Sequence, residues 1–185
     1  MKKSRQKGFT LLELMVSVAI IAIVSTIFLS SYRSGGRKSD LRMAAQMLVS
    51  NVRIAQSNAL SLKHFEGSMP DGGWGVVFDR NASEYVIFAD VDDDVVCDST
   101  CDNTSNEDAS RIALADGITI LDTLGDGGSI NRVQVSFLPP DPQIFICLDN
   151  AGQCNYSVGQ IVLGDSYSNT IKININKFGL VEIEK

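Results

Sequence analysis

Residues 9–29, FTLLELMVSVAIIAIVSTIFL, decide the architecture of this chain of 185 residues. This run holds a single charged side chain, Glu13. A helix rises about 1.5 Å per residue, so the run matches a hydrocarbon core about 30 Å thick and can span a bilayer. Four cations lie within residues 1–8, and the positive-inside rule therefore predicts one membrane pass with a cytoplasmic N-terminus and residues 33 onward outside.

Two ordinary explanations of this run stay open beside a more specific one. A secretory signal peptide has an apolar region of about 7–15 residues and then a small-residue cleavage site. This run is longer, and no clear A-x-A site closes it. A plain signal anchor would instead keep residues 1–8 attached to the chain.

The more specific explanation comes from the junction at Lys7-Gly8-Phe9. The sequence GFTLLELMVSVAIIAIV from Gly8 closely resembles the leader and transmembrane segment of type IV pilins and type II secretion pseudopilins. The resemblance implies that a prepilin peptidase cuts between Gly8 and Phe9 and that Phe9 is N-methylated. It also implies that Glu13 takes part in assembly with other pilins or pseudopilins, at an assembly platform in the inner membrane.

Glu13 has a physical role that does not depend on the resemblance. A carboxylate inside a membrane-spanning helix costs roughly 2.5–3.5 kcal/mol on insertion scales, so it is rare without a partner. Cleavage would create a cationic amine at Phe9, which the Glu13 of a neighbouring subunit could pair with in a low dielectric. The alternative is a glutamate near the interface whose side chain reaches the headgroups.

A second helical segment is predicted at residues 33–64. Apolar residues recur there at intervals of three and four, which is typical of an amphipathic helix that rests on a core; they are Leu41, Ala44, Ala45, Leu48, Val52, Ala55, Ala59 and Leu62. Gly35 and Gly36 precede this stripe, and each glycine costs about 1 kcal/mol in a helix relative to alanine. We therefore expect the helix to melt or bend there.

From residue 73 the apolar pattern changes to a period of two. Asn, Asp, Gly and Pro clusters separate nine candidate strands, at residues 75–78, 85–89, 111–114, 118–121, 133–138, 143–147, 160–163, 170–176 and 180–183. The predicted fold class is therefore α+β, with a long N-terminal helix packed on an antiparallel sheet. The predicted organisation is a leader at 1–8, a transmembrane helix at 9–32, an amphipathic helix at 33–64 and a β-rich extracytoplasmic head at 65–185.

The head sequence narrows the resemblance. The stretch AQSNA at residues 55–59, then GWGVVF at 73–78 and YVIFAD at 85–90, is similar to the minor pseudopilin H family (GspH/FimT). That resemblance implies a minor pilin or pseudopilin, a structural subunit that aids protein secretion or primes a filament. Competence pilins that capture DNA are an alternative. The cysteine-bearing insert at residues 92–108 departs from the pattern, so no partner contact there is carried over.

Four cysteines lie in the head, and an even number outside the cytoplasm suggests two disulfides with three connectivities. Local pairing of Cys97 with Cys101 and of Cys147 with Cys154 is favoured. A zinc site has poor ligand spacing and the wrong compartment, and free thiols in an anaerobe stay open.

An acidic run at residues 90–94 offers a different kind of site. Asp90, Asp92 and Asp94 occupy positions 1, 3 and 5 of an EF-hand-like loop, although Val95 replaces the turn glycine and Cys101 the bidentate glutamate. Calcium is thus one hypothesis for a signal-anchored surface domain, and a solvated acidic loop is the other. No other cofactor is expected.

Charge and motif content limit the remaining functions. Residues 65–185 hold six cations and twenty acids, a net charge of −14, which disfavours nucleic acid as a partner. The only histidine, His64, has no nearby nucleophile motif, and Trp74 is expected to be a core or sheet-edge aromatic. We therefore predict a structural subunit and not an enzyme, held in the cytoplasmic membrane before it enters a filament.

Overall fold

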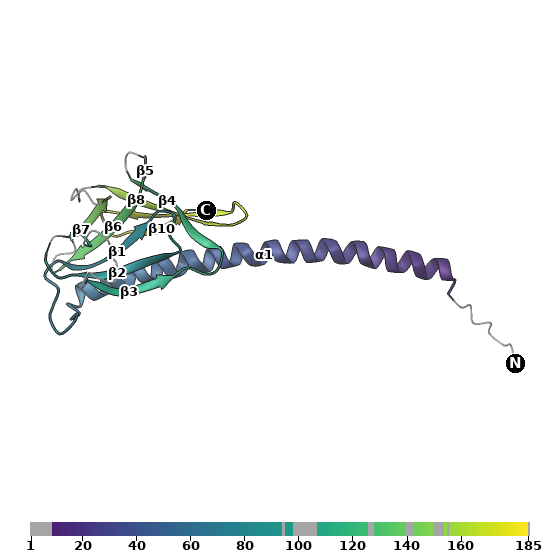
Figure 1. The fold of residues 1–185 in the computed structure, drawn as a ribbon, viewed down its shortest axis with the longest axis horizontal. Coiled ribbons are helices and arrows are strands. Elements are labelled where there is room, and N and C mark those ends of the chain that lie inside the picture. Colours follow the sequence, from purple (N-terminus) through teal and green to yellow (C-terminus); the bar gives the residue numbers. More distant parts are fainter. Residues whose placement is uncertain are drawn as a thin grey trace. The chain divides into compact units, whose positions relative to one another are not determined.

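The computed structural model describes residues 9–93, 95–97, 107–125, 128–139, 143–149, 154 and 156–184. Within the first range, residues 29–35 are described by their backbone only. The chain divides into two compact units, residues 1–39 and 40–185, which are described separately. Helix α1 (Leu11–Leu60) contributes residues to both (Figure 1). The helix expected on either side of Gly35 and Gly36 is thus one continuous element, and the predicted melting of the backbone at the two glycines does not occur.

In the second unit, α1 lies with its apolar stripe in the core. All members of the predicted stripe from Leu41 to Ala59 are buried, whereas Leu62 is 44% exposed. The reason is that the helix ends at Leu60, short of the predicted residue 64. Lys63 N–H donates to the Asn58 carbonyl and Leu62 N–H to the Ala59 carbonyl, with Leu62 at φ 52°. These two bonds form a Schellman cap, and its left-handed position turns Leu62 away from the stripe.

Two antiparallel five-stranded sheets form the rest of this unit. The first has the order β3-β2-β1-β6-β7 and the second β10-β9-β8-β4-β5. The strands are β1 (Gly73–Asp79), β2 (Glu84–Asp90), β3 (Asp108–Ala113), β4 (Ile118–Gly125), β5 (Gly128–Ile130), β6 (Arg132–Leu138), β7 (Gln143–Leu148), β8 (Val158–Asp165), β9 (Thr170–Asn176) and β10 (Val181–Glu184). All nine predicted strands are present in this part of the chain, and the α+β class is confirmed; the three-residue β5 was not predicted, because it is too short to show a period.

One hydrophobic core joins α1 to both sheets. Its members include Leu48 of α1, Val76 and Val135 of the first sheet, and Ile161 and Ile173 of the second, all fully buried. The sheets approach closely at Gly159 of β8, where an added Cβ would lie 2.9 Å from Val133 Cγ1. A larger residue at this position would force the sheets apart, so a glycine is required there.

The outer face of the first sheet is also buried. Val77, Val86, Phe88 and Cys97 form a second, smaller cluster on it. Residues 95–97 cover this face: Cys97 N–H donates to Gln134 Oε1 at 2.8 Å, and Ser136 Oγ donates to the Val95 carbonyl at 2.8 Å. Central strands β1 and β2 are therefore buried on both faces, which is why they read as nearly continuous apolar runs.

Candidate functional site

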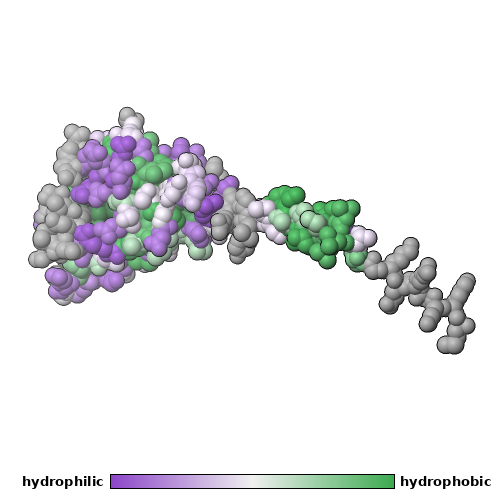
Figure 2. All heavy atoms as spheres, turned by 45° about the vertical axis from the view of Figure 1, so that its right-hand side comes forward, coloured by the Kyte–Doolittle hydropathy of each residue, from purple (hydrophilic) through white to green (hydrophobic). Residues whose placement is uncertain are grey.

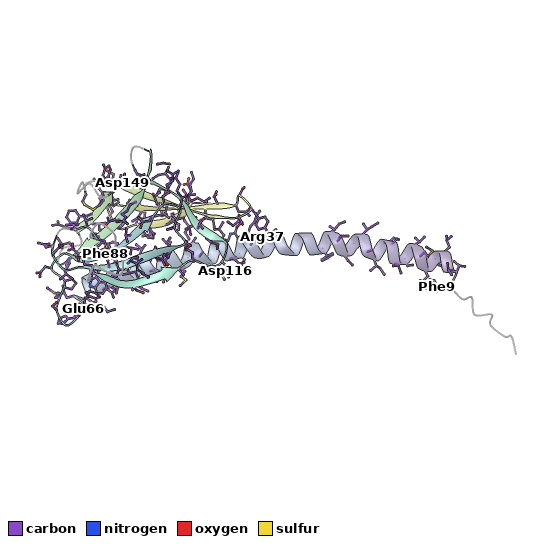
Figure 3. All side chains as sticks on the ribbon, in the orientation of Figure 1. Phe9, Arg37, Glu66, Phe88, Asp116 and Asp149 are labelled. Carbon is purple, nitrogen blue, oxygen red and sulfur yellow. A yellow bond between two sulfur atoms is a disulfide. The ribbon has the colours of Figure 1, made fainter. Side chains whose placement is uncertain are left out.

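The first candidate site is the N-terminal end of α1, in the first unit. Phe9 and Thr10 immediately precede the helix, and Phe9 lies at its N-terminal end (Figure 3). Glu13 N–H donates to Thr10 Oγ1 at 3.3 Å, so Thr10 is the N-cap and Glu13 the N3 residue. The spacing T-x-x-E is that of a capping box, and a carboxylate in the first turn also complements the helix dipole. Gly8 lies outside the described residues.

The side chains behind this end form an apolar surface. None of the 18-residue window Leu11–Phe28 is buried within the chain. Leu11 is 79% exposed and Phe28 74%, and Figure 2 shows this stretch covered by apolar groups. Two of its hydroxyls bond to the helix itself, since Ser17 Oγ donates to the Glu13 carbonyl and Thr26 Oγ1 to the Ala22 carbonyl. A helix with so long an exposed apolar surface needs lipid or another helix around it.

The acidic run of the head is not a simple solvated loop. Asp90 ends β2 fully buried, and its carboxylate accepts hydrogen bonds from Asp93 N–H at 2.9 Å and Val95 N–H at 2.7 Å. The carboxylates of Asp90, Asp92 and Glu107 each place an oxygen within 4.8 Å of the others. Glu107, which is 4% exposed, was not predicted as a member because it lies 17 residues from Asp90. The predicted ligand Asp94 lies outside the described residues.

Cys97 and Cys147 lie on the outer face of the first sheet, where Cys147 Sγ is 3.8 Å from the Val95 carbonyl oxygen. Cys147 of β7 and Cys154 form a disulfide across seven residues. Cys97 is also disulfide-bonded, and its predicted partner Cys101 lies outside the described residues. No cysteine among the described residues is free, which excludes the free-thiol and zinc alternatives for them. The disulfide ties Cys154, which precedes β8, to the end of β7.

A groove lies between α1 and the strands β2 and β3 in the second unit. Its volume is about 490 Å³, and its walls come from α1, from the connection after the helix and from the sheet. Trp74 is buried in the wall as predicted, and its Nε1–H donates to the Lys63 carbonyl at 3.1 Å. His64 is exposed and also contributes to the lining. Sequence reasoning missed the groove, because its walls come from segments far apart along the chain.

Comparison with known proteins agrees with this arrangement. The family signature described as the prokaryotic N-terminal methylation motif matches residues 3–29. A fimbrial protein of Dichelobacter nodosus is 30% identical over 134 residues, which are 71% of this chain and 74% of that protein. A type IV major fimbrial protein, FimA, of the same organism is 29% identical over 134 residues. No solved structure matches.

The chain belongs to the type IV pilin family. It is therefore a structural protein and not an enzyme, as the sequence predicted. Members of this family lie in the inner membrane through their hydrophobic helix before assembly and in the filament afterwards. The narrower resemblance to GspH/FimT is not specifically supported by these comparisons, which match fimbrial proteins instead.

Proposed function

We propose that this chain is a repeating subunit of a type IV pilus-like filament, stored in the inner membrane by residues 9–32 with its head outside. The methylation motif, together with the apolar helical stretch Leu11–Phe28 that has no buried side chains, is the observation that carries the proposal. The similarity to a relative named a major fimbrial protein supports a subunit that repeats along the filament. Lipid surrounds the apolar helix before assembly, and neighbouring helices replace the lipid afterwards.

Processing is proposed to fall between Gly8 and Phe9, with N-methylation of Phe9. The test is intact mass spectrometry of the chain purified from membranes of cells with an active prepilin peptidase. We expect loss of residues 1–8 and the gain of one methyl group, and neither change in cells that lack the peptidase. An intact Met1 terminus in the first cells would overturn the proposal, because the plain signal anchor, which keeps residues 1–8, would then be the better explanation.

Glu13 is proposed to pair with the terminal amine that cleavage creates at Phe9 of a neighbouring subunit. In this chain Glu13 lies in the first turn of α1, four residues from that amine, so the two charges of one subunit lie about 6 Å apart along the helix axis, and a neighbour offset by that distance would bring them together. Glu13→Ala should insert into the membrane as well as wild type and yet enter filaments poorly. Glu13→Asp keeps the charge and is the matched variant, and Ser17→Ala in the same helix is the control. Equal incorporation of Glu13→Ala and wild type would remove the pairing.

A minor pilin or pseudopilin of the GspH/FimT kind is the second candidate. The order of the head motifs at residues 55–59, 73–78 and 85–90 favours it. The two candidates differ in copy number, because a priming or capping subunit is rare in the filament and a repeating subunit dominates it. Quantitative mass spectrometry of sheared filaments distinguishes them. DNA capture is a weaker alternative, since residues 65–185 carry a net charge of −14 that repels phosphate.

Calcium binding by the head stays a hypothesis. It is favoured by the carboxylate oxygens of Asp92 and of the buried Asp90 and Glu107, which lie within 4.8 Å of one another. Calcium takes six to eight oxygen ligands, and carboxylates are its usual ones. If the ion binds, calcium at 100 times its Kd should stabilise the head by about 2.7 kcal/mol. Asp92→Ala removes an exposed ligand and should abolish this effect. A shift equal to that of sodium chloride at the same ionic strength would leave the cluster as a support for the turn alone.

A further inference from the structure

One turn of the head holds an aromatic ring out in solvent. Phe178, between β9 and β10, is 81% exposed. Phe178 N–H and Leu180 N–H donate to Asn176 Oδ1 at 2.9 and 3.1 Å, and Gly179 N–H donates to the Asn176 carbonyl at 2.9 Å. Gly179 has φ 78°, which closes the turn at little steric cost. The ring is therefore presented by a preorganised turn, so binding through it would require little further ordering.

The groove beside α1 offers an apolar socket on the same unit. Two of its helix residues, Met47 and Ile54, are 55% and 45% exposed, which leaves unpartnered apolar surface at its mouth. Its other large apolar residues are Phe65, Trp74, Ile87 and Ile112. Aromatic side chains seated in desolvated pockets of this kind carry much of the energy of protein interfaces.

The turn and the socket lie on opposite flanks of α1. Gln56 of α1 faces the turn, since its Nε2 lies 3.1 Å from where a Cβ on Gly179 would stand. At 3.6 residues per turn, Ile54 and Met47 lie roughly 160–180° around the helix from Gln56. A contact between this turn and this groove therefore has to join two different molecules.

We propose that Phe178 of one subunit inserts into the groove of a second copy of the chain. The proposal rests on the proposed function as a repeating filament subunit and names the surfaces that repeat. Joining two different surfaces of identical subunits gives a heterologous contact, which propagates into an open helical array wherever its rotation does not close into a ring. Such an array needs the inserting side chain and the receiving groove on different sides of the subunit, and Phe178 and the groove lie on opposite flanks of α1.

Charge supports the choice of a second copy as the occupant. Lys177 stands beside Phe178, with its Nζ 5.5 Å from the ring centroid, and both side chains are exposed. Exposed Glu66 lines the socket, in the connection that follows α1 (Figure 3). In the proposed contact, the ammonium of Lys177 on one subunit would then lie near the carboxylate of Glu66 on the other. The socket's own cation, Lys63, is directed to the Trp74 ring, 5.3 Å from its centroid.

Photo-cross-linking in the full chain tests the contact directly. A benzoyl-phenylalanine in place of Phe178 keeps an aromatic ring at the tip of the turn. Irradiation of membranes and of sheared filaments should yield a dimer of the chain, with the adduct on the peptides that line the groove, those of residues 47–66 and those that hold Trp74, Ile87 or residues 109–112. The same probe at Tyr167, which is 62% exposed in the turn between β8 and β9, is the matched control. Adducts elsewhere on the chain, adducts to a different protein, or equal dimer from both sites would overturn the proposal.

Incorporation into filaments provides the second test. Phe178→Ala should lower the filament-bound fraction of the chain about tenfold or more, while Tyr167→Ala stays within about twofold of wild type. Lys177→Glu and Glu66→Lys should each impair incorporation, and the double variant should restore it. If wild type enters filaments and Phe178→Ala enters them equally well, the contact is refuted and the proposed function is not. The same holds if the double variant does not restore incorporation. Wild type missing from filaments would refute the proposed function, and the absence of a membrane cross-link would then refute the contact as well.

Discussion

Replacing Asp90 with alanine should remove the support of the turn that covers the outer face of the first sheet. The carboxylate holds two backbone N–H groups, those of Asp93 and Val95, in a site where Asp90 itself is fully buried. The turn is strained, because Asp93 has φ 64° and Val95, a β-branched residue, has φ 69°. Residues in this region cost about 1–3 kcal/mol each and persist only where their surroundings hold them.

The size of the effect follows from these bonds. Each N–H group left without its acceptor costs about 1–3 kcal/mol, and both groups here are only part-buried, so water offsets a share of it. We therefore expect Asp90→Ala to lower the free energy of unfolding of the head by about 2–4 kcal/mol. Asp90→Asn keeps one acceptor oxygen but points its amide N–H group at the other backbone donor. Its free energy of unfolding should therefore lie between those of wild type and the alanine variant.

The assay is denaturant unfolding of the full chain in detergent, followed by the fluorescence of Trp74. This residue is the only tryptophan and is 4% exposed in the core, so its emission reports on the head. Asp92→Ala in calcium-free buffer is the control, since Asp92 is exposed and its removal should then change the free energy of unfolding by less than about 0.5 kcal/mol. An Asp90→Ala variant within that same margin of wild type would refute the reasoning.

Three further predictions use the same unfolding measurement. Leu48→Ala, at a fully buried position of α1, should destabilise the head by about 2–5 kcal/mol, whereas its exposed neighbour Met47→Ala should have little effect; equal losses would mean that the assigned core face of α1 is wrong. Leu62→Gly should stabilise it by about 0.5–1 kcal/mol, because Leu62 holds φ 52° at the cap; a loss would show that its side chain contributes more than the strain removes. Burial raises the pKa of Tyr85 above 10.0, against the opposing hydrogen bond from Asn51. The folded state therefore keeps the phenol proton where the unfolded chain loses it, and stability should fall as the pH rises above about 10, a fall that Tyr85→Phe should lack.

The sequence alone determined the features that depend on local chemistry. The length and apolarity of residues 9–29 predict a membrane-spanning helix whatever follows it, because a bilayer selects by length and hydropathy. The stripe from Leu41 to Ala59 and the alternation at Ile171, Ile173 and Ile175 predict which faces are buried, since helices and strands have fixed periods. The disulfide between Cys147 and Cys154 was favoured by their short separation but could not be separated from two other connectivities.

Only the tertiary structure decided which distant residues meet. The sequence predicted one antiparallel sheet, and the fold has two with a common core, because strand order is set by packing and not by the pattern within any strand. Glu107 joins Asp90 because β3 pairs with β2, and no local signal relates residues 17 positions apart. The groove, and the placing of Phe178 on the opposite flank of α1, likewise depend on the side of the helix on which each sheet edge lies. Such relations arise from three-dimensional packing, so a one-dimensional pattern carries little trace of them.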